Sequence, residues 1–266
     1  MIILHLTDTH LVGDGLCIGK VDTSSFLKSA MDAVLAWPFK PDAVIHTGDI
    51  SDDGSVRSYE TFKAEVARLG VPVFAVPGNH DDRDAMRKVL RPGQPHLAEE
   101  GFLHYTARLG ALDLIGLDTL DHGAAGRLCP ERLAFAERAL RASAGRPTVL
   151  FMHHPPLAVG MPFMDRIACA GAEALAPMIE AHGAVQVVLA GHAHRTLTTR
   201  FAGVPFMLSA SPAHQFALAI GDDRPVGFVM EPPSCLVHVW LEDAARLVSH
   251  VVPLGDYGPV HPFPSN

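Results

Sequence analysis

Five short apolar runs in this sequence each lead into a polar cluster of Asp, His or Asn. One of them, AVIHTGDIS at residues 43–51, stops at Thr47-Gly48 and presents Asp49. The other four runs lead into polar clusters at residues 8–10, 78–81, 153–156 and 191–194. Apolar runs of this length predict buried strands, so the polar clusters are expected at strand ends. In layered α/β folds, that rim is where ligands bind.

The composition favours one large α/β domain that spans residues 1–266. Hydrophobic residues make up 48% of the chain, which is enough to bury a substantial core. The formal net charge is −8 and no Lys/Arg cluster stands out, which argues against a nucleic-acid polymer as partner. The chain has 16 histidines, many of them at the ends of the apolar runs. That distribution is typical of a metal site.

We expect neither a signal peptide nor a membrane span. The first apolar run follows no cationic region and stops at Asp8, and no run reaches membrane-spanning length. The four cysteines form no CxxC pair: Cys17, Cys129, Cys169 and Cys235. They are expected to be reduced thiols, which favours a cytoplasmic protein.

Hydrophobic periodicity predicts helices between the strands and further strands towards the end of the chain. The predicted helices cover residues 22–37, 55–69, 81–90, 130–143 and 171–182. The predicted additional strands cover residues 102–108, 111–117, 204–209, 217–220, 236–241 and 247–252. Residues 157–170 are expected to form an irregular loop beside the site. This segment is expected to form either a wall of the substrate site or, if Met161, Phe163 and Met164 are exposed, a subunit contact.

The polar clusters combine carboxylate, imidazole and amide groups. Asp8 and His10 are two residues apart, as are His192 and His194, so each pair is expected to project from one face of a strand. This mixture of oxygen and nitrogen donors suits Mn²⁺, Fe²⁺, Co²⁺ or Zn²⁺ better than a thiolate-seeking ion. The sequence therefore predicts a site for divalent metal ions at this rim.

The order DxH, GD, GNHD, HHPP and GHxH resembles the calcineurin-like metallophosphoesterase superfamily. The segments FMHHPPL, MDRIAC and SCLVH are similar to those of bacterial glycerophosphodiesterases and the related class III cyclic nucleotide phosphodiesterases. The resemblance implies an αββα sandwich, with two mixed sheets flanked by helices. It also implies two metal sites that share one residue: Asp8, His10, Asp49 and His194 for one ion, and Asp49, Asn79, His153 and His192 for the other.

The reaction implied is hydrolysis of small phosphodiesters, glycerophosphodiesters or 3′,5′-cyclic nucleotides, by attack of a metal-bound hydroxide. Two divalent ions, Asp8, Asp49 and one hydroxide leave about one net positive charge, which matches a phosphodiester monoanion. Asp49, as the bridging residue, and His80, as proton donor, are the expected catalytic residues. Asn79, His80 and His214 are the expected substrate contacts, and His214 aligns with a substrate-side histidine of the relatives.

Two other functions stay open from the sequence. A phosphomonoesterase of the same fold would benefit from extra fixed cations, and Arg127, Arg166 and Arg195 are candidates to touch a phosphate. A metal-binding interaction module without catalysis would be expected to have lost some ligands. Residues 216–233 resemble the region that forms the dimer contact in the relatives, so a homo-oligomer is expected.

Several polar residues near the motifs have simpler expected roles. His5 and His46 lie within apolar strands and are expected to be hydrogen-bonded core histidines. Asp52, Asp53 and Asp81 are expected to be carboxylates of loops or helix starts. For His154, which follows a predicted ligand, orientation of that ligand and plain packing are equally open.

Overall fold

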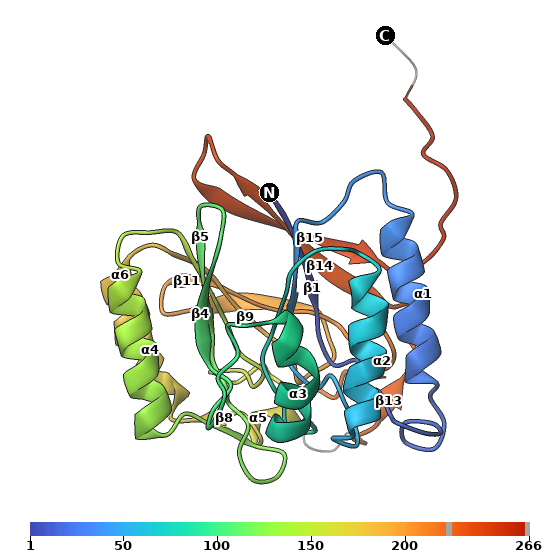
Figure 1. Ribbon diagram of the computed structural model, residues 1–266, viewed down its shortest axis with the longest axis horizontal. Coiled ribbons are helices and arrows are strands. Elements are labelled where there is room, and N and C mark those ends of the chain that lie inside the picture. Colours follow the sequence, from blue (N-terminus) through green and yellow to red (C-terminus); the bar gives the residue numbers. More distant parts are fainter. Residues whose placement is uncertain (222–224, 264–266) are drawn as a thin grey trace.

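Two mixed β-sheets form the centre of the molecule in the computed structural model, which describes residues 1–221 and 225–263. One side of the sandwich is covered by three helices: α1 (Thr23–Leu35), α2 (Val56–Ala67) and α3 (Arg83–Leu90). The other side is covered by α4 (Pro130–Ala142) and α6 (Leu175–His182) (Figure 1). The expected αββα sandwich is therefore confirmed.

The first sheet has the strand order β15-β14-β1-β2-β3. Its strands are β1 (Ile2–Leu6), β2 (Ala43–His46), β3 (Val73–Ala75), β14 (Ser234–Leu241) and β15 (Arg246–Pro253). Strands β1, β2 and β3 are parallel, whereas β14 and β15 pair antiparallel. Because α1 and α2 connect the parallel strands, the carboxyl ends of all three reach the same edge.

The second sheet has the strand order β10-β11-β9-β7-β5-β4. Its strands are β4 (Tyr105–Leu109), β5 (Leu112–Gly116), β7 (Thr148–Phe151), β9 (Val185–Ala190), β10 (Leu197–Phe201) and β11 (Val204–Leu208). Strands β5, β7, β9 and β11 are parallel to one another. At the two edges, β4 pairs antiparallel with β5, and β10 pairs antiparallel with β11. This sheet too therefore ends its parallel strands at one edge.

Short elements lie around the edge where the parallel strands end. Two-residue strands pair as β6 (Gly126–Arg127) with β8 (Cys169–Ala170) and β12 (Gln215–Phe216) with β13 (Phe228–Val229). The remaining helical turns are η1 (Arg91–Gly93), α5 (Pro162–Asp165) and η2 (Ala172–Ala174).

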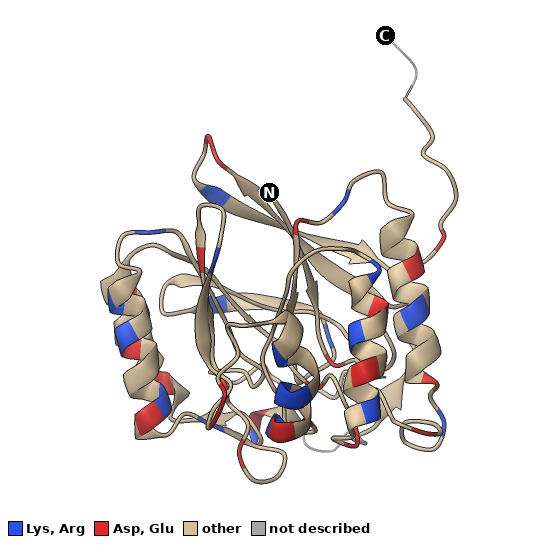
Figure 2. Cartoon of the chain, in the orientation of Figure 1, with Lys and Arg blue, Asp and Glu red and all other residues tan. Residues whose placement is uncertain are grey.

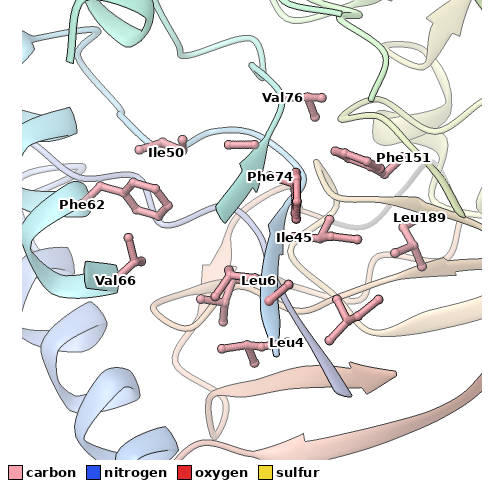
Figure 3. Packing of buried hydrophobic residues seen from close by; sticks show 14 of the residues in the cluster. Leu4, Leu6, Ile45, Ile50, Phe62, Val66, Phe74, Val76, Phe151 and Leu189 are labelled. Carbon is pink, nitrogen blue, oxygen red and sulfur yellow. The ribbon is translucent and has the colours of Figure 1, made fainter. Parts of the chain in front are cut away.

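Side chains of the second sheet alternate between the two layers of the core. Phe151 belongs to the cluster shared with the first sheet, whereas its neighbour Leu150 packs in the cluster of α4 and α6. Figure 3 shows Phe151 and Leu189 in the same packed region as Ile45 and Phe74. Burial of each such side chain stabilises the fold by about 1.5–3 kcal/mol. The sheets thereby give the loops at their edge a rigid base.

The helix boundaries follow local signals that the sequence contains. The carboxylate of Asp22 accepts a hydrogen bond from the Ser25 N–H at 3.0 Å and so caps α1. The hydroxyl of Ser55 accepts one from the Ser58 N–H at 3.2 Å and caps α2. Gly183 ends α6 at a φ of 70°, the left-handed conformation that favours glycine.

Three sequence predictions were wrong. Residues 157–170 are not an irregular loop, because they contain α5 and the strand β8. Met161 and Met164 are only 5% and 2% exposed, since they pack in the cluster of α4 and α6 rather than on the surface. No strand forms over residues 217–220, because β12 ends at Phe216 and only the Ala217 N–H continues the pairing, to the Gly227 carbonyl. The strand β10 was not predicted, because its residues LTTRF are mostly exposed and carry little apolar signal.

Charged residues of both signs are mixed on the helices. Figure 2 shows Lys and Arg beside Asp and Glu along α1, α2 and α4. Two pairs of these neighbours form exposed ion pairs, Lys28 with Asp32 at 3.3 Å and Arg141 with Glu137 at 2.5 Å. Such exposed pairs contribute about 0–1 kcal/mol each. Among the described residues, no helix has the length and apolar character needed to cross a membrane.

Candidate metal centre

The structure brings all seven predicted ligands together where the parallel strands end. They follow β1, β2, β3, β7 and β9, and they are Asp8, His10, Asp49, Asn79, His153, His192 and His194. Six of them are at most 5% exposed, and Asn79 is half-buried. Buried carboxylates and imidazoles at this density need partners of opposite charge or hydrogen-bonding character.

The first donor cluster contains Asp8, His10, Asp49 and His194, whose ligand atoms all lie within 4.8 Å of one another. His194 Nε2 is 3.3 Å from Asp8 Oδ1, and His10 Nε2 is 3.5 Å from Asp49 Oδ2. Two oxygen and two nitrogen donors thus surround a single point. Such a set fits one divalent ion of the borderline class.

The second donor cluster forms around His153. Its Nε2 atom is 3.1 Å from Asn79 Oδ1, 3.2 Å from His192 Nδ1 and 3.3 Å from Asp49 Oδ2. The same Asp49 oxygen therefore approaches both clusters. A carboxylate in this position can be shared by two cations, which offsets part of their mutual repulsion.

The hydrogen bonds outside the clusters assign the tautomers of three histidines. Nδ1 of His10 donates to Asp52 at 2.9 Å, and Nδ1 of His194 donates to the His214 carbonyl at 2.9 Å. A neutral imidazole carries one N–H, so each ring in its neutral form has its proton at Nδ1 and a lone pair at Nε2. These two Nε2 atoms are 3.0 Å apart. Lone pairs that face each other at this distance repel, and a cation between them removes the repulsion.

His153 is held in the same way, since its Nδ1 donates to the Thr47 carbonyl at 2.8 Å. Burial works to lower the pKa of His153, but Asp49 and Asp8 overcome burial and raise it to about 9. Burial raises the pKa of Asp8 to about 6. His192 Nε2 is buried and has no hydrogen-bond partner. The carboxylates thus favour positive charge at this position, and His192 Nε2 is not satisfied by protein groups, as is typical of a site that binds cations.

The backbone at this centre is strained. Five of the seven predicted ligands have left-handed φ angles: 51° at Asp8, 44° at His10, 53° at Asp49, 72° at His192 and 50° at His194. Non-glycine residues adopt this region rarely, at a cost of about 1–3 kcal/mol each. The sequence suggested that Asp8 and His10 share one face through side-chain alternation along a strand. This explanation was wrong, because β1 already ends at Leu6. The two side chains converge because the chain turns through left-handed residues.

Motif glycines give these ligands room. A Cβ atom on Gly78 would lie 2.2 Å from Asp49 Oδ1, and one on Gly191 would lie 2.0 Å from Thr7 Oγ1 and 2.8 Å from Asp8 Oδ2. Any side chain at either position would displace a carboxylate. The glycines before Asn79 and His192 are therefore part of the centre.

Asp81 holds two of the ligand loops together, a role that the sequence analysis missed. Its buried carboxylate accepts hydrogen bonds from the N–H groups of Ile50, Ser51 and Gly78 and from the Tyr59 hydroxyl, at 2.9–3.2 Å. Burial and the nearby Asp49 raise its pKa to about 6. The cap of α3 is instead Asp82, so Asp81 is not a helix-start residue.

Asp52 is the second residue that the sequence analysis missed. Its carboxylate accepts from His10 Nδ1 at 2.9 Å and lies 3.3 Å from His80 Nδ1. Burial opposes its ionisation, but the hydrogen bonds from His10 and His80 lower its pKa. A carboxylate behind a histidine fixes the tautomer and orientation of the ring. The only signal in the sequence was its place shortly after Asp49 on the same loop.

His80 lies at the mouth of the centre, and its side chain is 42% exposed. Its ring contacts that of His10 edge to face, with centroids 4.7 Å apart. The backbone N–H of His80 donates to Asp49 Oδ1 at 2.9 Å. Burial lowers the pKa of His80, but the hydrogen bond to Asp52 and the charge of Asp49 outweigh it and raise the pKa to about 9. The ring therefore carries a proton beside the clusters.

His214 and His154 both lie next to the ligands. The ring of His214 is 4.8 Å from that of His194, its Nδ1 is buried without a partner, and burial lowers its pKa to about 4. His154 is near His153 and His192, but its Nδ1 bonds to the Thr119 hydroxyl at 2.9 Å and its Nε2 to the Ala124 carbonyl at 3.2 Å. Both ring nitrogens of His154 are thus engaged, so it packs behind the ligands.

Other expectations are resolved by contacts. His5 and His46 are fully buried and bond to Thr47 and Thr9, at 3.0 and 3.3 Å, which confirms them as core residues.

Two of the arginines proposed for phosphate contact are engaged elsewhere. Arg127 pairs with Asp121 at 3.1 Å, and Arg195 pairs with Glu231 at 3.1 Å. Neither acidic partner is a predicted metal ligand, so these ion pairs do not direct the arginines at the clusters. For Arg166 the expectation stays a prediction.

A cavity of about 230 Å³ opens over both clusters. Its lining includes His10, Asp49, Asn79, His192 and His194 of the clusters together with Asp52, His80 and His214. The rest of the lining is apolar: Ile18, Ala124, Phe163, Met164, Ile167 and Phe216. The described lining residues include no Lys or Arg, and the positive charge of protonated His80 lies 3.3 Å from the Asp52 carboxylate, which offsets it.

Comparison with known proteins agrees with this geometry. A protein named probable glycerophosphodiester phosphodiesterase GpdQ, from Arcobacter nitrofigilis, is 34% identical over 99% of this chain and 97% of its own. A probable cyclic nucleotide phosphodiesterase from Rhodopseudomonas palustris is 35% identical over 92% of this chain and 89% of its own. Both similarities extend over nearly the whole chain.

A solved structure and a family model give the same result. The crystal structure of a dimetal phosphatase from Danio rerio superposes with a TM-score of 0.68 at 18% identity and covers 96% of each chain, which supports the fold. The model of the calcineurin-like phosphoesterase family matches residues 1–196, which carry all seven predicted ligands. The chain therefore belongs to the calcineurin-like phosphoesterase family.

Proposed function

We propose that the chain is a two-metal hydrolase of small phosphodiesters. The ions would be held by the two clusters that share Asp49: Asp8, His10, Asp49 and His194 for the first, and Asp49, Asn79, His153 and His192 for the second. The observation that carries the proposal is the approach of Asp49 Oδ2 to His10 Nε2 at 3.5 Å and to His153 Nε2 at 3.3 Å. The class, a metal-dependent phosphoric diester hydrolase, is that of the family and of the relatives over most of the chain.

The charge of the site favours a diester over a monoester. Two divalent ions carry four positive charges, of which Asp8, Asp49 and one bound hydroxide would remove three. The cavity lining among the described residues adds no Lys or Arg. A phosphodiester monoanion needs fewer positive charges than a monoester dianion, which would gain from fixed cations beside the metals. This observation supports a phosphodiesterase over a phosphomonoesterase of the same fold.

The protein groups around the clusters have distinct roles. Bound ions would supply a water of lowered pKa as the nucleophile and would neutralise charge on the phosphoryl oxygens. Asp49 would hold both ions, and Asn79 would be an uncharged ligand close to the substrate. His80 holds a proton at the mouth of the cavity and would donate it to the leaving alkoxide or to a phosphate oxygen. His214 is neutral and its Nδ1 has no partner, so it would accept a hydrogen bond from the substrate or donate one to it.

The names of the relatives suggest the substrates. Glycerophosphodiesters and 3′,5′-cyclic nucleotides are the classes named for proteins that match most of this chain. We propose both for this chain, with Mn²⁺, Fe²⁺, Co²⁺ or Zn²⁺ as the ions. We also propose a cytoplasmic location, where the four free cysteines would stay reduced, and cell fractionation tests it.

The whole chain is proposed to act as a single domain that associates through residues 216–233. Within this segment Leu218, Ile220, Val226 and Met230 are 58%, 67%, 51% and 51% exposed, and residues 222–224 lie outside the described part. A cluster of exposed apolar side chains is typical of a protein contact. Sedimentation at micromolar concentration is expected to give a dimer or a higher oligomer. A monomer for the intact chain, with the same result after Leu218→Asp and Ile220→Asp, would remove this proposal.

Hydrolysis of model substrates tests the reaction class. Metal-stripped protein reconstituted with Mn²⁺ is expected to cleave bis(p-nitrophenyl) phosphate faster than p-nitrophenyl phosphate, because the described cavity lining adds no Lys or Arg for a dianion. Release of p-nitrophenol measures both rates. Faster turnover of the monoester would indicate a phosphatase, and silence with both substrates would indicate a binding module.

His80→Ala separates proton donation from metal binding. Loss of a general acid typically lowers turnover by about 10²–10⁴-fold, and we expect kcat for a diester with a poor leaving group to fall in that range. Metal content, measured by elemental analysis, is expected to be unchanged, because His80 is not among the proposed ligands. Loss of metal in this variant would show that His80 supports the centre structurally.

Asp52→Asn tests the carboxylate behind His10. The amide cannot hold the ring tautomer as the carboxylate does, so we expect metal affinity to fall about 10–100-fold. Titration with Mn²⁺ in a calorimeter measures this change. Asp14→Asn is the matched control, since Asp14 is exposed on the neighbouring loop and pairs only with Arg57 among its ion-pair contacts. Equal affinity for Asp52→Asn and the control would remove the proposed role.

A further inference from the structure

One part of the cavity wall is apolar and comes from three separate segments. Phe163 and Met164 belong to α5, Ile167 follows it, Phe216 belongs to β12, and Ile18 lies in the glycine-rich loop after β1. The rings of Phe163 and Phe216 are 6.3 Å apart between centroids, at an interplanar angle of 37°. We call these five residues the apolar wall.

We infer that the apolar wall binds a flat ring on one ester group of the substrate, such as a nucleobase. The inference rests on the proposed function and specifies the substrate class of the same site. Stacking of a base on an aromatic side chain and burial of apolar area both favour this binding. A glycerol group carries hydroxyls that need hydrogen-bond partners, and the side chains of the apolar wall offer none.

The position of Phe216 is fixed by Arg195, the residue that follows the predicted ligand His194. The Arg195 guanidinium donates to the Phe216 carbonyl at 2.6 Å and pairs with both carboxylate oxygens of Glu231 at 3.1 Å. The Phe216 ring also packs against His194, with centroids 4.9 Å apart and an interplanar angle of 68°. Arg195 is thus a positioning residue that ties the apolar wall to the metal-binding loop.

A second chain of hydrogen bonds supports the same segment. Gln215 accepts from the Glu231 N–H at 2.9 Å and donates to the Ser211 carbonyl at 2.8 Å. The Ser211 hydroxyl in turn donates to the Asp8 carbonyl at 2.7 Å. The wall is therefore held at a set distance from the first donor cluster before any substrate arrives. Such pre-organisation reduces the entropy cost of binding.

A matched pair of substrates isolates the base. Adenosine 2′,3′-cyclic phosphate and glycerol 1,2-cyclic phosphate both contain a five-membered cyclic diester, so the reacting bonds are alike and the base is the main difference. With Mn²⁺-reconstituted protein, we expect kcat/KM at least about tenfold higher for the adenosine compound, through KM, as loss of one stacking contact would imply. Phe216→Ala and Phe163→Ala are each expected to lower the ratio of the two kcat/KM values about tenfold.

Two comparisons separate wall contact from general damage. Phe39→Ala removes a ring at 39% exposure beyond the end of α1 and is expected to leave the ratio unchanged. Arg195→Ala is expected to lower the ratio, and Arg195→Lys to restore part of it. Thermal unfolding checks that each variant is folded. If Phe216→Ala does not fold, Phe163→Ala takes its place in the comparison.

A binding measurement avoids dependence on the metals. Saturation transfer by NMR from metal-free protein to the adenine protons of adenosine is expected for the natural sequence and for Phe39→Ala, and is expected to be lost in Phe216→Ala. Equal kcat/KM for the two cyclic phosphates, or transfer that persists in Phe216→Ala, would overturn the inference and leave the proposed function standing. Failure of the reconstituted protein to cleave any diester, while adenosine still binds, would overturn the proposed function instead.

Discussion

The facing ring nitrogens of His10 and His194 are the constraint on which the rest of the site depends. Their Nε2 atoms are 3.0 Å apart, and each ring is fixed from behind by a hydrogen bond from Nδ1. Neither ring can turn away without leaving Asp52 or a buried carbonyl without its partner, which is costly. The arrangement is therefore stabilised by positive charge, a proton or a metal ion, between the two nitrogens. The acceptors behind the histidines, as much as the histidines themselves, define this centre as one for cations.

The same constraint explains why so large a scaffold surrounds so small a centre. Left-handed backbone at five predicted ligands is unfavourable, and it persists only where the surrounding structure over-determines it. Two packed sheets supply that rigidity, since the ligand loops begin directly at the buried ends of β1, β2, β7 and β9. Asp81 adds a direct link between the Asn79 and Asp49 loops, because its carboxylate accepts from the N–H groups of Ile50 and Ser51. The strain at the centre is thus balanced by the packing of the sandwich.

The sequence predicted what depends on residue type and order along the chain. Short apolar runs that end in Asp, His or Asn were enough to place the strands and the rim, whereas the grouping of the predicted ligands into two sites came from the family resemblance. The roles of Asp52 and Asp81 were missed because they depend on which donors surround a carboxylate, and those donors come from other loops. Met161 and Met164 were placed on the surface because an irregular, glycine- and proline-rich stretch gives no periodicity from which burial can be judged. The backbone conformation at Asp8 and His10 was missed for a related reason, since no local pattern marks left-handed non-glycine residues.

Reaction and selectivity are built from different parts of this chain. The donor clusters come from loops that continue the central strands, and their glycines leave no room for a side chain beside Asp8 or Asp49. The apolar wall comes from α5, β12 and the loop that carries Ile18, which lie outside the two central sheets. A change in the wall can alter the ester group that fits while the clusters stay intact, because few of the interactions described above connect the two parts: the Arg195 contacts, the packing of Phe216 on His194, and the hydrogen bonds of Gln215 and Ser211. Substrate preference can therefore shift between related chains without loss of the chemistry, which is consistent with relatives of similar identity that carry the names of different phosphodiesterases.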